Sequence, residues 1–111
     1  MEKLEEIIMP LIVESGEAKS AAFEAIRKAK EKDMDGAAVQ LDYAKEHLLQ
    51  AHHRQTSLLQ QEAAGQSVAV SLLMVHAQDH LMTAMTVKDL AEILIDLYQQ
   101  NHELRKAVTG E

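Results

Sequence analysis

Apolar residues recur with a helical period in three segments of this chain, and glycine-containing breaks separate the segments. The first segment runs from about residue 2 to residue 31 with an interruption at Ser15-Gly16, the second covers residues 37–64, and the third covers residues 68–104. Because short connectors place consecutive helices antiparallel, this pattern predicts an all-α fold, a three-helix antiparallel bundle in one domain of residues 1–104. Residues 105–111 are expected to form a frayed C-terminal tail.

The first half of the third segment departs from this pattern, because apolar residues surround its whole axis. Between residues 67 and 87, Asp79 is the only formally charged residue. A helix that is apolar on all sides must be buried on all sides, yet a three-helix bundle leaves one side of each helix facing water. Either this surface is unusually apolar or the helix binds further copies of the chain. We favour self-association, because large exposed apolar patches mark interfaces.

Composition narrows the class of protein. The 111 residues include no cysteine and only 3% aromatic residues, which excludes disulfides and thiolate metal sites and predicts an aliphatic core. The net charge of −7 disfavours nucleic acid as a partner. The longest apolar run, residues 7–13, is far shorter than the roughly 20 residues of a membrane span, and the acidic first residues do not resemble a signal peptide. We therefore expect a cytoplasmic protein without membrane insertion.

Four polar residues stand close together inside the apolar third segment: His76, Gln78, Asp79 and His80. Burying such groups costs free energy unless each has a partner. At 3.6 residues per turn, His76 faces Asp79 and His80 one turn later, so three titratable groups share one helix face. Gln78 lies about 200° around the helix axis from His76 and is expected to serve a neighbouring helix or subunit.

Histidine is the member of this tetrad best suited to covalent chemistry. A neutral imidazole nitrogen is nucleophilic near neutral pH, and a phosphorylated imidazole passes its phosphoryl group on readily. His80 is placed to donate a hydrogen bond to phosphoryl oxygens or to His76 itself. The alternative is that His76 is a buried histidine whose hydrogen bonds are simply satisfied, which is common for a single histidine on an apolar face.

Three motifs resemble those of the lactose/cellobiose-type enzyme IIA family of the bacterial sugar phosphotransferase system. Residues 75–82, Val-His-Ala-Gln-Asp-His-Leu-Met, resemble the family's active-site signature. Residues 15–20 resemble its Ser-Gly-x-Ala-Arg-Ser break, with Lys19 where arginine is usual, and residues 51–58 resemble its Ala-His-x-x-Gln-Thr-x-Leu run. The motifs follow the family's order and spacing across most of residues 4–100, which makes the resemblance specific.

The resemblance implies a homotrimer that packs nine helices around a three-fold axis. His76 matches the family's phosphorylated histidine, and Gln78 and His80 match residues that line the same site. Asp79 matches the family's metal ligand. Symmetry would bring three copies of this carboxylate together, and like charges need protons or a cation between them. Oxygen ligands suit Mg²⁺, so we expect one ion per trimer on the axis.

Other positions leave alternatives open. Asp79 could instead orient His76 or His80 without a metal. His52 matches the family's helix-two histidine and is placed to reach the site, whereas His47 and His53 are expected to face solvent. His102 lies in a polar stretch and carries no functional indication.

The function implied by the resemblance is that of a phosphocarrier. The chain would accept phosphate from phospho-HPr on His76 and pass it to the cysteine of a IIB protein during uptake of a β-linked disaccharide such as lactose, cellobiose or chitobiose. No direct sugar binding is expected. One alternative is a signalling histidine-phosphotransfer module, although such modules carry His-x-x-Lys-Gly where this chain has Asp79-His80. Another is a helical oligomer with a structural His/Asp metal site.

Overall fold

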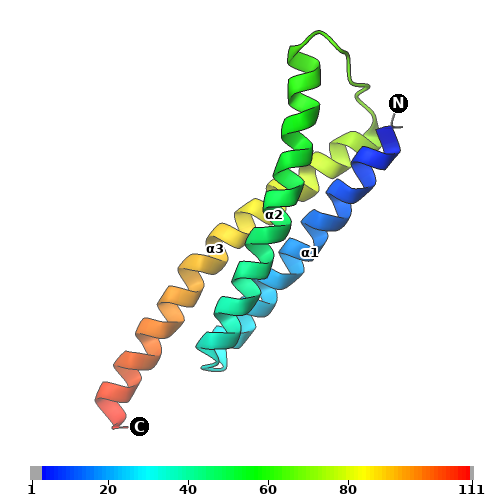
Figure 1. Ribbon diagram of the computed structural model, residues 1–111. Helices are drawn as coiled ribbons and strands as arrows, with labels where there is room; N and C mark the ends of the chain where they lie inside the picture. The colour runs from blue at the N-terminus through cyan, green and yellow to red at the C-terminus, as the bar shows by residue number, and fades with distance from the viewer. Residues whose placement is uncertain (1–3, 111) are drawn as a thin grey trace.

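Three long helices account for most of the computed structural model, which describes residues 4–110. They are α1 (Leu4–Lys30), α2 (Met34–Ala63) and α3 (Leu72–Thr109). Figure 1 shows α1 and α2 joined by a tight turn and running antiparallel, while α3 crosses them and extends past that turn. The molecule is a rod of 63 × 20 × 19 Å. The predicted all-α, three-helix protomer is therefore confirmed, although a first-helix start at residue 2 lies outside the described residues.

Helix α1 runs through Ser15-Gly16 without the predicted interruption. A glycine inside a helix costs about 1 kcal/mol relative to alanine. Burial of the flanking Ile8, Leu11 and Ala18 outweighs that cost, because all three are almost completely removed from solvent. Tertiary packing therefore overrides the local glycine preference.

The turn between α1 and α2 is closed by backbone and side-chain contacts. The Lys32 N–H donates to the Ala29 carbonyl at 3.1 Å and the Asp33 N–H to the Lys28 carbonyl at 2.9 Å. Lys32 adopts a left-handed conformation with φ of 71°, at the position where helix C-terminal motifs usually carry glycine. Asp33 then caps α2, accepting a 2.9 Å hydrogen bond from the Gly36 N–H, so α2 begins at Met34 rather than at residue 37.

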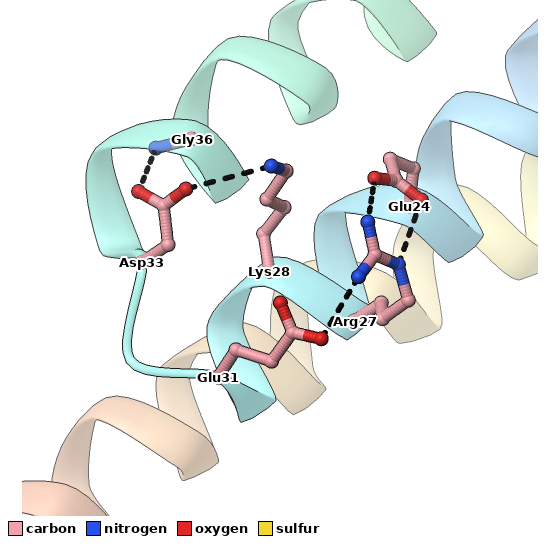
Figure 2. Close-up of polar contacts among 6 residues, drawn as sticks. All are labelled: Glu24, Arg27, Lys28, Glu31, Asp33 and Gly36. Carbon is pink, nitrogen blue, oxygen red and sulfur yellow. Dashed lines mark hydrogen bonds and ion pairs between the residues drawn. The ribbon is translucent and has the colours of Figure 1, made fainter.

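Several charged side chains around this turn are paired, as Figure 2 shows. Arg27 lies between Glu24 and Glu31, with a 2.8 Å contact to Glu31, and Lys28 lies 3.7 Å from the Asp33 carboxylate. The hydrogen bond that Arg27 donates to Glu24 lowers the pKa of the Glu24 carboxyl and raises the pKa of the Arg27 guanidinium. These exposed pairs contribute little to stability, because solvent screens them.

Both ends of α3 differ from the predicted ends. The helix begins after Ser71, whose hydroxyl accepts a 3.1 Å hydrogen bond from the Met74 N–H, and not after Ser67. It continues to Thr109, where Gly110 ends it in a left-handed conformation. Residues 105–109 are thus helical rather than frayed, because a glycine cap and basic residues stabilise the negative end of the helix. Residue 111 of the predicted tail is outside the described residues.

Alanines dominate the core and let the helices approach closely. One buried cluster contains Leu11, Leu48 and Leu81, and a second contains Ala22, Ala44 and Ala91. The face of α3 that points away from α1 and α2 carries large apolar side chains that remain exposed, among them Val75, Met82, Ile93, Leu97 and Leu104. No helix within residues 4–110 is apolar enough over a sufficient length to cross a membrane.

Candidate functional site

His76 and His80 lie one turn apart on a flank of α3, as predicted. Their ring centroids are 4.5 Å apart and the ring planes meet at 72°, an edge-on arrangement. His76 is exposed and His80 is half-buried. The alternative of a buried His76 with satisfied hydrogen bonds is therefore wrong. A nitrogen of an accessible imidazole can act as a nucleophile toward a group on another molecule.

Asp79 is exposed on the same helix, and no described residue forms a hydrogen bond or ion pair with it. The alternative in which Asp79 orients His76 or His80 of its own chain has no contact to support it. Across residues 4–110, no group of three or more His, Asp or Glu residues of one chain could hold a metal ion. Any metal at Asp79 needs ligands from outside the protomer.

Gln78 lies on the opposite flank of α3 from His76 and contacts α2. Its carbonyl oxygen accepts a 2.5 Å hydrogen bond from the side-chain amide of Gln55, and its own amide approaches the Met74 sulfur at 3.8 Å. The prediction that Gln78 serves a neighbouring helix is confirmed. This bond also explains why Gln55 interrupts an otherwise apolar stripe, since a buried polar group requires a partner.

His52 is not brought to His76 within one chain. With Met85 and Lys88 it lines a hollow of about 280 Å³ between α2 and α3. Met85 follows His76 by nine residues, which is about 180° around the helix, so this hollow opens on the other flank. A hydrogen bond to Asp89 raises the pKa of Lys88, which lies in the wall of this hollow. His53 is exposed, as predicted.

Two other histidines have structural partners that the sequence analysis missed. His47 was expected to face solvent, which is wrong, because it is half-buried between the Glu14 carboxylate and the Tyr43 ring. His102 donates from Nε2 to the Ala29 carbonyl at 2.7 Å. Helical spacing could have found His47, since it follows Ala44 by three residues on the buried side of α2.

The fold and site together define a small all-α protein with an accessible histidine pair on its last helix. The family model described as the lactose/cellobiose-specific IIA subunit of the phosphotransferase system matches residues 6–99, which include the whole tetrad. This chain belongs to that family and is a sugar-specific IIA component of a phosphotransferase system. Family membership favours this interpretation over a signalling histidine-phosphotransfer module.

Known relatives cover nearly the whole chain. The lichenan-specific phosphotransferase enzyme IIA component of Bacillus subtilis is 50% identical over 106 residues, which is 96% of each chain. The cellobiose-specific enzyme IIA of Bacillus anthracis has a crystal structure that matches with a TM-score of 0.89 and 47% identity, covering 93% of this chain and 94% of that one. A complex of the chitobiose IIA with HPr from Escherichia coli matches with a TM-score of 0.79 and 40% identity, covering 92% and 99%.

Proposed function

We propose that this chain accepts a phosphoryl group from phospho-HPr on His76 and passes it to the cysteine of a IIB protein. The observation that carries the proposal is the exposure of His76 beside the His80 ring. A ring nitrogen of His76 forms a bond to phosphorus as the bond to the donor breaks. The IIB thiolate then forms a bond to phosphorus as the bond to His76 breaks. The structural relative in complex with HPr supports this choice of donor.

Electrostatic stabilisation falls to the neighbours of His76. Phosphoryl transfer depends on positioning and on hydrogen-bond donors more than on covalent help. His80 lies close enough to donate to the phosphoryl oxygens or to hold the His76 ring in place. The Gln78 side chain is turned toward α2 and away from His76 of its own chain. If Gln78 contributes to phosphoryl transfer, it does so at the His76 of an adjacent copy.

The transported sugar is a β-linked disaccharide such as lactose, cellobiose or chitobiose, and it does not contact this chain. Relatives in sequence carry the names of two such disaccharides, N,N'-diacetylchitobiose and lactose, and of the β-glucan lichenan. A carrier that handles only the phosphoryl group has no need of a sugar site at His76. Sugar selection then belongs to the membrane permease.

A homotrimer would cover the exposed apolar face of α3. Leu72, Asp79, Thr86 and Ile93 recur every seven residues along that face, and Val75 and Met82 stand between them. We call these six positions the outer seam. Four of the six are apolar, and Asp79 and Thr86 are polar. Apolar residues at heptad positions pack helices against one another, and polar residues at such positions select the register and number of helices. Three copies of α3 at a common axis would give an assembly of nine helices.

In that assembly the seam carries Asp79 to the axis, while the histidines stay beside it. His76 is about 60° around the helix from Asp79, so it lies on the flank of the seam. Three Asp79 carboxylates without partners in their own chains would repel one another unless a cation neutralises them. Their oxygen atoms fit a hard cation, and we propose one Mg²⁺ per trimer at Asp79.

The test is phosphorylation of the purified protein in a phosphoenolpyruvate-driven HPr system. We expect one acid-labile phosphate per chain, located on His76 by peptide mapping. Omission of HPr should abolish the label, and addition of the IIB protein should remove it. An absence of label with HPr present would exclude the phosphocarrier function and leave a structural His/Asp metal site as the remaining candidate.

A further inference from the structure

One hollow of the described residues lies far from the histidine pair. It has a volume of about 620 Å³ and lies where the α1–α2 turn meets the last turns of α3. His102, in its wall, follows His76 by 26 residues, which is about 39 Å along the helix at 1.5 Å per residue. Its volume falls in the range of roughly 300–1,000 Å³ that small-molecule sites occupy. A ligand here would not touch the phosphorylation site.

The wall of this hollow is positively charged, although the whole chain carries a charge of −7. Lys32, Arg105 and Lys106 contribute cationic groups, and Glu103 contributes one carboxylate. Neither Lys32, Arg105 nor Lys106 forms an ion pair with a carboxylate in residues 4–110. By contrast, Arg27 and Lys28, on the last turns of α1, are both paired (Figure 2). The cations of the wall are thus free to bind an anion.

His102 adds a buried polar atom without a partner. Its Nε2 donates to the Ala29 carbonyl at 2.7 Å, so this nitrogen carries the hydrogen. The other ring nitrogen, Nδ1, is buried and has no hydrogen-bond partner among the described residues. Buried polar atoms are nearly always satisfied, and an orphaned one indicates a bound water or ligand. With the hydrogen on Nε2, Nδ1 can only accept a hydrogen bond, and because it is closed to solvent, a ligand hydroxyl in the hollow would reach it only after a shift of the His102 side chain.

Lys32 occupies a backbone position that does not favour lysine. Its φ of 71° is left-handed, and glycine adopts that conformation without the clash that a Cβ atom causes. The lysine therefore lowers the stability of the turn while placing an ammonium group in the wall of the hollow. Residues held in strained backbone conformations cluster at ligand-binding and active sites.

From these observations we infer that the hollow binds a small phosphorylated sugar. The guanidinium of Arg105 and the two ammonium groups suit a phosphomonoester, since guanidinium and phosphate form paired, charge-assisted hydrogen bonds. Gln99, Glu103 and His102 line the same hollow and offer both donors and acceptors to hydroxyl groups. A single phosphate ion would leave most of a 620 Å³ hollow unfilled. This inference is independent of phosphotransfer at His76.

The test is a titration of the ¹⁵N-labelled full-length protein with glucose 6-phosphate, followed by amide NMR shifts. We expect saturable shifts at Lys32, Gln99, His102 and Arg105 and none near His76. Glucose alone should produce no saturable shifts, and inorganic phosphate should bind at least tenfold more weakly. Sedimentation with phosphatidic acid vesicles separates a soluble ligand from a lipid headgroup, and we expect no co-sedimentation.

Two variants test the side chains directly. Arg105→Gln should weaken glucose 6-phosphate binding at least tenfold, whereas the control Arg54→Gln, an exposed arginine on α2 outside the hollow, should not change it. Lys32→Gly should also weaken binding while raising the melting temperature, so lost binding cannot be attributed to unfolding. Absence of saturable shifts at millimolar glucose 6-phosphate, equal losses in Arg105→Gln and Arg54→Gln, or binding to vesicles alone would each overturn the inference.

Discussion

The side-chain amide of Gln55 on α2 donates a 2.5 Å hydrogen bond to the side-chain carbonyl of Gln78 on α3. This bond joins two helices that make less extensive contact with each other than either makes with α1. It also turns Gln78 away from His76 of its own chain. Gln55 belongs to the motif of residues 51–58 and Gln78 to the motif of residues 75–82, so the hydrogen bond links the two motifs.

Removal of one partner from this pair should destabilise the protein more than removal of both. Gln55→Leu leaves the Gln78 carboxamide half-buried without its partner, which costs about 1–3 kcal/mol of unfolding free energy. In Gln55→Leu/Gln78→Leu the loss should be smaller, because no polar group is left unsatisfied. Urea unfolding of the wild type, both single variants and the double variant measures the coupling. Additive losses would mean that the hydrogen bond contributes nothing specific.

His76→Ala should abolish phosphorylation and leave helicity unchanged. The side chain is exposed and lies against the His80 ring, so its removal creates no cavity in the core. The measurement is phosphate incorporation from phospho-HPr together with circular dichroism. His53→Ala, which removes another exposed histidine, is the matched control and should label fully. Label that persists in His76→Ala or maps to His80 would refute the assignment.

The protein should sediment with about three times the 12.4 kDa mass of the chain. Met82→Lys places a charge on the outer seam and should shift the equilibrium toward monomers, because an unpaired buried charge is costly. Val39→Lys is the control, since Val39 is also exposed but lies on α2. Sedimentation equilibrium at micromolar concentration distinguishes these cases. A monomeric wild type would contradict the proposed interface.

Chelation should lower the melting temperature of the wild type, and excess Mg²⁺ should restore it. The reason is mass action, since a cation that binds only the folded trimer stabilises it. Asp79→Leu removes the like charges and adds apolar contacts, so it should be neutral or stabilising by roughly 1–4 kcal/mol per site at most. Thermal denaturation of both proteins with and without chelator provides the measurement. A chelator-insensitive wild type combined with an Asp79→Leu variant that dissociates would rule out the axial metal.

Lys32→Gly should stabilise the fold by about 1 kcal/mol, because glycine adopts the left-handed conformation without strain. Lys19→Gly is a useful comparison, since Lys19 is helical and glycine there should cost about 1 kcal/mol. Urea unfolding measures both changes. A Lys32→Gly variant less stable than the wild type would show that the lysine side chain contributes to folding.

The sequence by itself determined the number of helices and the helix faces on which the tetrad lies. The period of apolar residues defined three helices, and the tetrad on the third helix could be placed on its faces from spacing alone. This spacing correctly put His76 beside His80 and Gln78 on another flank, because the geometry of a helix depends only on its own backbone. The continuity of α1 through Gly16 could not be predicted in this way, since it depends on burial against the other helices.

Tertiary structure decided which polar groups meet across helices. His47 pairs with Glu14, Gln55 with Gln78, and His102 with the Ala29 carbonyl, and each pair joins residues far apart in the sequence. The last turns of α3 extend past the α1–α2 turn and form the basic hollow with it, although Lys32 and Arg105 are separated by most of the chain. Periodicity describes one helix at a time, and these contacts depend on how helices pack together.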